Sequence, residues 1–167
     1  MMGLKRSLVA ILLTSFVLTC FAADDYYYNV TITTSPTARA KFDNHEGKLK
    51  IKLKGINNLQ KTGSQEFTLT STPVNIKNDA TWSFPIRTEI GYEKLQEIEL
   101  RWTLKSPFNP IYLVSKPKIF FEPILVSINR VDGGIKRQII RQFCAKKIPQ
   151  AIEHSEEKSF KPCPIYN

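Results

Sequence analysis

The cysteines and histidines of this chain, which could act as nucleophiles, bases or metal ligands, are few and far apart. Beyond Cys20 near the start, they are Cys144, Cys163, His45 and His154. Nucleophilic hydrolysis needs a base beside a serine or a thiol. His45 stands in a polar stretch and His154 in the charged stretch EHSEEK, so both are expected to be solvated. Two thiols and two distant histidines also lack metal-ligand spacing, so we expect no catalytic residue, metal or cofactor.

Two carboxylates at close spacing, Glu97 and Glu99, resemble the acid pairs of some active sites. Side chains alternate between the two faces of a strand, which places both on the same face as Arg101. An exposed face of balanced charge explains this pattern better than a reactive pair does.

The most regular charged pattern is GKLKIKLKGI, residues 47–56. In a strand, Leu49, Ile51 and Leu53 share one face and the lysines share the other. The lysines predict an anion-binding face, called the lysine face below: Lys48, Lys50, Lys52 and Lys54. The alternative is a solvated face that discourages edge-to-edge pairing. Five later basic residues would extend this face if they lay on the same side: Lys136, Arg137, Arg141, Lys146 and Lys147.

A second candidate site is the segment TLKSPFNPIYLVSKPK, residues 103–118, called the apolar loop below. Its apolar residues predict lipid contact: Phe108, Ile111, Tyr112, Leu113 and Val114. Lys105, Lys116 and Lys118 flank them. Connecting loops run over the surface, where apolar side chains need a cover. A membrane interface suits this mixture, because apolar side chains sink among the headgroups while lysines meet anionic lipid. The alternative is that residues 111–114 form another strand packed on the core.

The first 22 residues have the layout of a secretory signal peptide, with a basic start, an apolar run and small residues before the cut. We expect cleavage between Ala22 and Ala23, and the alternative is an uncleaved anchor. The mature chain, residues 23–167, then has the size of one domain and is secreted. It keeps 22 basic and 15 acidic residues, a net charge of +7. This charge favours anionic lipid or acidic polysaccharide, and export makes nucleic acid the least expected partner.

Removal of the signal leaves Cys144 and Cys163, which allow one disulfide in an oxidising compartment. Asn29, Val30 and Thr31 form a sequon for N-glycosylation at Asn29.

The elements that must position these residues are short and alternating, which is typical of β-strands. Strands are expected at 27–33, 48–54, 66–71, 81–89, 95–102 and 118–131, the last broken at Pro123, with a turn at 132–134 into 135–144 and a final piece near Cys163. Pro85 indicates an edge strand or a bulge. A helix is conceivable only around residues 148–157. About eight strands predict an all-β, antiparallel β-sandwich.

The segment ATWSFPIRTEIGYEKLQEIELRW, residues 80–102, followed by the apolar loop and IKRQIIRQFC, resembles the PLAT domain at the C-terminus of lipoprotein lipase and pancreatic lipase. The agreeing residues are Ser83, Phe84, Ile86, Thr88, Glu89, Leu95, Leu100, Trp102, Phe143, Cys144 and Cys163. The resemblance implies two four-stranded sheets, a cysteine pair closing the end of the domain, and a non-enzymatic module that brings an enzyme to a lipid surface. This sequence has no G-x-S-x-G motif and no room for a lipase catalytic domain.

The sequence therefore predicts a secreted PLAT-like module that binds a lipid or membrane surface, or a lipid-associated protein, through the apolar loop and its lysines. The alternative is a secreted module or effector that binds a protein, such as a separate lipase chain, without affinity for lipid.

Overall fold

The computed structural model of this protein describes residues 25–36, 44–57, 59–106, 108, 110, 112 and 116–164. The predicted signal peptide, residues 1–22, lies outside this part of the chain. The described residues form strands and connections, with no helix long and apolar enough to cross a membrane among them.

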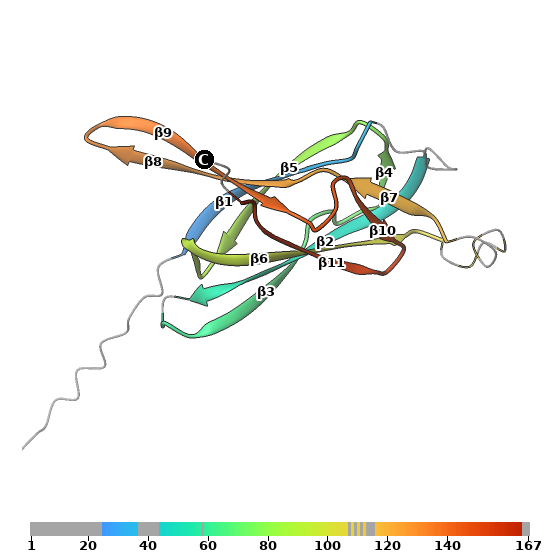
Figure 1. The fold of residues 1–167 in the computed structure, drawn as a ribbon, viewed down its shortest axis with the longest axis horizontal. Coiled ribbons are helices and arrows are strands. Elements are labelled where there is room, and N and C mark those ends of the chain that lie inside the picture. Colours follow the sequence, from blue (N-terminus) through green and yellow to red (C-terminus); the bar gives the residue numbers. More distant parts are fainter. Residues whose placement is uncertain are drawn as a thin grey trace, which may run out of the picture.

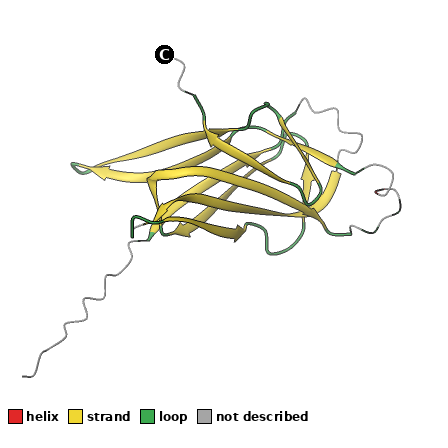
Figure 2. Ribbon diagram, turned by 60° about the horizontal axis from the view of Figure 1, so that its bottom comes forward, coloured by secondary structure: helices red, strands yellow, loops and turns green. Residues whose placement is uncertain are grey.

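The fold consists of antiparallel strands in two layers, which confirms the predicted all-β sandwich (Figures 1 and 2). There are eleven described strands instead of about eight: β1 (Tyr26–Thr33), β2 (Asn44–Asn57), β3 (Thr62–Thr68), β4 (Val74–Lys77), β5 (Thr81–Thr88), β6 (Ile90–Leu104), β7 (Lys118–Phe121), β8 (Ile124–Asp132), β9 (Ile135–Cys144), β10 (Gln150–Glu153) and β11 (Glu157–Pro162).

The strands pair in one continuous order, β3-β2-β6-β11-β9-β8-β1-β5, with β4 also paired to β2, and β7 and β10 form a separate pair. The first four strands of this order make one layer and the last four make the other. The strand β11 joins them, because Phe160 pairs with Ile98 of β6 while Lys161 pairs with Cys144 of β9. At the other side of the sandwich, the side chain of Gln65 in β3 accepts hydrogen bonds from the Thr88 hydroxyl (2.5 Å) and the Glu89 amide (3.1 Å). The two layers are therefore linked along both of the edges where they meet, which are called the seams below.

The core comes from alternate residues of both layers. The predicted inward residues of β2 and β6 are buried, including Leu49, Leu53, Ile98 and Trp102. Their neighbours on the opposite face are charged, so one face of the sheet is apolar and the other faces solvent, as the alternation predicted.

The strand β5 is at the end of the strand order, as Pro85 predicted. Proline has no backbone N–H to donate to a further strand, so it is tolerated at an edge. The predicted turn at residues 132–134 is also present, with positive φ angles at Gly133 (57°) and Gly134 (84°).

The helix considered around residues 148–157 is wrong. Gln150–Glu153 forms β10, which pairs with β7 and places Ile152 opposite Ile119 in the core. Ser155 then takes a positive φ of 63°, a value outside the right-handed helical region. Burial of Ile152 against β7 decides the local structure here, although the composition of the segment allowed a helix.

The cysteine pairing is confirmed by a disulfide between Cys144 and Cys163, at the end of β9 and just after β11. It lies where the two layers meet at β11.

Candidate functional site

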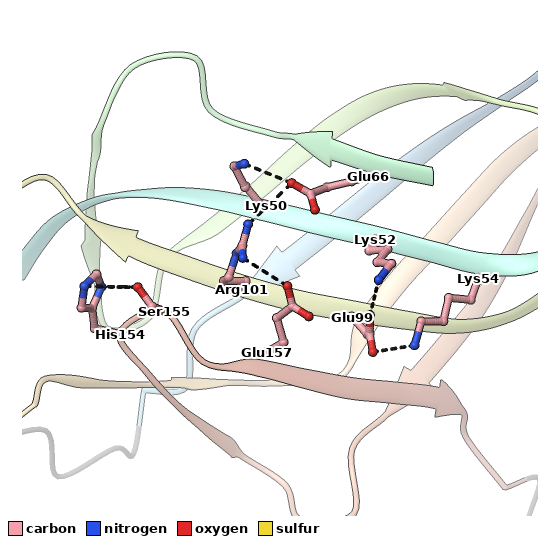
Figure 3. Close-up of polar contacts among 9 residues, drawn as sticks. All are labelled: Lys50, Lys52, Lys54, Glu66, Glu99, Arg101, His154, Ser155 and Glu157. Atoms are coloured by element: carbon pink, nitrogen blue, oxygen red, sulfur yellow. Dashed lines mark hydrogen bonds and ion pairs between the residues drawn. The ribbon is translucent and has the colours of Figure 1, made fainter. Parts of the chain in front are cut away.

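The lysine face lies on the outer side of β2, as the alternation predicted, and carboxylates of the neighbouring strands meet it (Figure 3). The Lys50 ammonium lies 3.0 Å from a Glu66 carboxylate oxygen of β3. Lys52 lies 3.5 Å from Glu99 of β6, opposite it in register. Three of the four strands of this layer thus contribute charge to a single surface.

Lys54 has the most contacts of the lysine face, at 2.6 Å from Glu99 and 3.1 Å from Glu97. Hydrogen bonds to Glu99 and Glu97 raise the pKa of Lys54. Burial alone would raise the pKa of Glu97, but hydrogen bonds from Lys54 and Ser159 hold it below its ordinary value. Similarly, the hydrogen bond from Lys50 lowers the pKa of Glu66.

Arg101 continues this surface across to β11, at 3.3 Å from Glu157 and 3.6 Å from Glu66 (Figure 3). The result is a ladder of alternating charges across β3, β2, β6 and β11. Lys48 is half-buried, opposite Thr103. The charge-balanced face expected around Glu97, Glu99 and Arg101 is present, and the lysines predicted to bind anions share it with these carboxylates.

The apolar loop follows β6 at the end of the sandwich where β2 begins, since Leu104 pairs with Gly47. Phe108 is 94% exposed, the most exposed large apolar side chain among the described residues. Tyr112 packs partly against the core. The other predicted lipid-contact residues, Ile111, Leu113 and Val114, lie outside the described residues, and so does the choice between a loop and a strand at 111–114.

The three lysines flanking the apolar loop are exposed. Lys105 lies 2.8 Å from Glu46, and Lys118 lies 2.9 Å from Glu153. No ion pair of Lys116 occurs within the described part of the chain, and its positive charge contributes to lowering the pKa of His154. A surface that combines an exposed aromatic ring with these cations can meet both the apolar and the anionic parts of an interface.

Aromatic and imidazole rings pack at the base of the apolar loop. The Trp102 indole N–H donates to the Ile152 carbonyl oxygen (2.8 Å), and its ring centre lies 5.6 Å from that of His45 and 5.9 Å from that of His154. Tyr112 also contacts His45, edge to face, with 6.5 Å between ring centres. These contacts connect the loop to the core.

The expectation that His45 is solvated is wrong: only 4% of this residue is exposed. The strand β2 begins at Asn44, earlier than predicted, so His45 shares the inward face of Leu49. Extending the predicted strand from Lys48 back by three residues would have found this. Burial lowers the pKa of His45, which favours the neutral ring.

His154 is half-buried, and its pKa is also lowered, chiefly by burial and then by Lys116. Its Nδ1 accepts a hydrogen bond from the Leu104 amide (3.0 Å), while Ser155 Oγ lies 3.2 Å from Nε2 (Figure 3). A catalytic triad needs a carboxylate that accepts from Nδ1–H. Here Nδ1 is itself the acceptor, so this serine and histidine lack the third member.

The described residues contain no group of three or more histidine, cysteine or acidic side chains that could hold a metal ion. The predicted sequon residue Asn29 is exposed on β1, so its side chain is accessible.

Three of the five further basic residues, Lys136, Arg137 and Arg141, lie on β9 and not beside the lysine face. Lys136 and Arg137 are neighbours in β9 and so point to opposite faces, in the other layer of the sandwich. Arg141 lies over the rings of Tyr92 and Phe143, at 5.5 and 5.4 Å from their centres. Lys146 lines an open groove beside the disulfide, together with Lys158, Lys161 and Ile148. Sequence reasoning did not find this groove, because it forms where residues distant in sequence meet.

No protein-family model matches this sequence, and no curated protein does. Solved structures of lipoxygenases are similar in fold: a deletion variant, the same variant with an isoleucine-to-tryptophan substitution, and the variant in complex with arachidonate each match at a TM-score of 0.53 and 13% identity. The match covers 84% of this chain but only 17% of each lipoxygenase chain. The likeness supports the predicted PLAT-like fold, without support from sequence.

Proposed function

We propose that this protein is a non-enzymatic module that attaches to a lipid surface through the end of the sandwich that carries the apolar loop. The observation that carries this proposal is the exposure of Phe108 at that end, with Lys105, Lys116 and Lys118 around the loop. The fold likeness, which covers 17% of each lipoxygenase chain, supports a PLAT-like module of this kind.

The energetics suit reversible attachment. Full burial of a phenylalanine side chain contributes about 1.5–3 kcal/mol, and each lysine near an anionic headgroup adds about 1 kcal/mol. Lys105 and Lys118 have carboxylate neighbours, which reduces their contribution. We therefore expect binding that depends on both the ring of Phe108 and the anionic lipid.

Export and glycosylation are part of the same proposal. The signal-like start of the sequence, the disulfide between Cys144 and Cys163 and the exposed Asn29 all suit an extracellular protein. Expression in a secreting animal cell should release into the culture medium a protein that begins at Ala23. This protein should lose mass on treatment with an endoglycosidase. The Asn29→Gln variant should show no such loss.

The test of lipid attachment is sedimentation of the mature protein with vesicles of phosphatidylcholine, alone or with phosphatidylserine, at about 50 mM and 500 mM salt. We expect the Phe108→Ser variant to lose about tenfold or more in affinity. The matched control is Leu59→Ser, which removes a 65% exposed apolar side chain from the turn after β2, at the opposite end of that strand. No binding by the native protein, or equal losses in the two variants, would contradict the proposal.

A further inference from the structure

The hairpin of β8 and β9 extends beyond the sandwich, at the end of the molecule opposite the end of β6 and the start of β7 (Figures 1 and 2). The strand β1 pairs with β8 only over Leu125–Ser127, and β11 pairs with β9 only at Phe143 and Cys144. Within the described part of the chain, residues 129–138 therefore have no strand on either side of the ribbon. These residues are called the distal hairpin.

The backbone of β9 presents unpaired hydrogen-bonding groups along its outer edge. A two-residue turn with both φ angles positive pairs its flanking residues, Asp132 and Ile135, through two hydrogen bonds. From this turn onward, residue pairs of β8 and β9 that exchange backbone hydrogen bonds alternate with pairs that do not. The N–H and C=O groups of Lys136, Gln138 and Ile140 consequently point away from β8.

A contact further along β9 agrees with this alternation. Gln142, the next residue in the series, points its carbonyl oxygen away from β8 and accepts a hydrogen bond from the Cys163 amide (2.9 Å). From Lys136 to Ile140, no described segment of this chain occupies the corresponding position.

Apolar side chains are exposed along this ribbon. Val131 is 62% exposed, Ile135 58% and Ile140 55%. A two-stranded ribbon is only marginally stable in water, and exposed isoleucines on its free edge add a cost that a partner would remove. Basic residues alone would be explained as protection of an edge against unwanted pairing, but that role does not account for the isoleucines.

The charge of the distal hairpin selects the kind of partner. Arg130, Lys136 and Arg137 are basic, and Asp132 is the one acidic residue of the segment 129–138. Pairing of two copies through β9 would bring two sets of these cations together, which opposes self-association. An acidic strand would instead meet opposite charges across the ladder.

We propose that the outer edge of β9 accepts an extended, acidic segment of a partner protein as an added strand. Main-chain hydrogen bonds to Lys136, Gln138 and Ile140 would provide affinity. Each face of β9 has a cation and an exposed isoleucine, which would select a strand with acidic and apolar residues on both of its faces. This site is separate from the lipid-attaching end, so the module would hold a protein partner at one end and a surface at the other.

The probe is a labelled ten-residue peptide in which pairs of glutamates alternate with pairs of valines, so that both residue types lie on each face of the added strand. Its binding to the mature protein is measured by fluorescence anisotropy. We expect binding at low salt, slower hydrogen exchange of the Lys136, Gln138 and Ile140 amides, and weaker binding of the peptide with lysine in place of glutamate. The measurement contains no lipid, so it is independent of the lipid-attachment proposal.

Two pairs of variants separate edge pairing from general attraction. Gln138→Pro removes an outward N–H that does not bond to β8, and we expect an affinity about tenfold lower than that of Gln138→Ala. Lys136→Glu with Arg137→Glu should abolish binding, whereas Lys77→Glu, at another exposed lysine, should leave it within about twofold after correction for net charge. The charge variants do not alter the backbone, so they remain informative if the proline disturbs the hairpin.

Three binding results would overturn the proposal. They are equal binding of the glutamate and lysine peptides, equal affinity of the Pro and Ala variants with intact folding, and no binding by the native protein. A dimer in sedimentation velocity that Gln138→Pro dissociates would also overturn it, because the edge would then serve a second copy of this chain.

Discussion

At the scale of single residues, the contacts around Trp102 explain why two histidines that looked like surface groups have lowered pKa values. His45 is enclosed by Trp102 and Tyr112, and His154 accepts a hydrogen bond from the Leu104 amide. Both surroundings favour the neutral imidazole. Since the rings lie beneath the apolar loop, their protonation affects the same end of the molecule as Phe108.

The pH dependence of stability follows from these shifts. A histidine with a lowered folded-state pKa binds its proton more readily in the unfolded chain, so the free energy of unfolding falls as pH drops below about 6.5. Above that pH both states are neutral and the histidines have no effect. We expect urea unfolding to show lower stability at about pH 5.5 than at pH 7.5.

The His45→Asn variant should reduce this difference between the two pH values, although it also lowers stability at both. The paired carboxylates have lowered pKa values, so their effect begins at more acidic pH. An unchanged pH difference in both His45→Asn and His154→Gln would exclude these two rings as its source.

The sequence could predict inward and outward residues only where the strand boundaries were right. Leu49 and Trp102 were assigned correctly from alternation. His45 was missed because the Glu and Gly after it read as a loop, and its burial depends on pairing of Asn44–Gly47 with β4.

At the scale of elements, two glycines that face each other on β2 and β3 have different roles. A Cβ on Gly55 would meet the Lys94 carbonyl oxygen and lie 2.7 Å from Ile90 Cγ2, beside a shift in the β2–β6 register. Gly63, its partner on β3, has no atom within 4 Å of such a Cβ.

We therefore expect Gly55→Ala to lower the free energy of unfolding by about 1–3 kcal/mol through overpacking. Gly63→Ala should change it by no more than about 0.5 kcal/mol. Urea denaturation of both variants measures this contrast, and equal effects would mean that the bulge relaxes to admit a methyl group.

The charge ladder gives a second prediction at this scale. Neutralising Glu97 and Glu99 would leave Lys52 and Lys54 without the carboxylates that lie within 3.5 Å of them. The Glu97→Gln/Glu99→Gln protein should bind a sulfated polysaccharide more tightly than the native protein, with the gain lost at about 500 mM salt.

The control for this experiment changes the same net charge at exposed sites, Glu89→Gln/Glu93→Gln. If both double variants gain equally, net charge alone accounts for the affinity and the lysine face is not a local anion site.

Two elements could not be found from sequence. The strands β4 and β10 have four residues each, too few for an alternation to stand out, and both are stabilised by partners far along the chain. Ile76 pairs with His45 and Ile152 with Ile119. Tertiary pairing thus created strands where turn residues predicted a loop or a helix.

At the scale of the whole molecule, the Cys144–Cys163 disulfide fastens the seam where β11 passes from one layer to the other. The two cysteines are 19 residues apart in the sequence, and the loop that the disulfide closes contains β10 and β11. Loops of this length contribute about 3 kcal/mol when crosslinked.

We expect the Cys144→Ser/Cys163→Ser protein to be less stable by about that amount, with thermal unfolding as the measurement. Reduction of the native protein should lower its midpoint to match, and should not lower that of the serine variant. An unchanged midpoint in both would show that pairing of β11 with β6 is sufficient to hold the seam.

The two layers and the disulfide could be predicted from alternation and from the cysteine count, but the way the layers join could not. Pairing of Lys161 with Cys144, and the hydrogen bonds of Gln65 to Thr88 and Glu89, connect segments that no local pattern relates. The apolar loop was found from composition, whereas the exposed edge of β9 required knowledge of what lies beside it.

Pro85 has a consequence for how large an assembly of this protein can become. It occupies the last strand of one layer and offers no amide to an incoming chain, while the edge of β9 is free of proline. A molecule that has accepted a strand at β9 therefore presents a poorer acceptor at β5. Solutions of this protein should not polymerise into fibrils through repeated contacts between β9 of one molecule and β5 of the next.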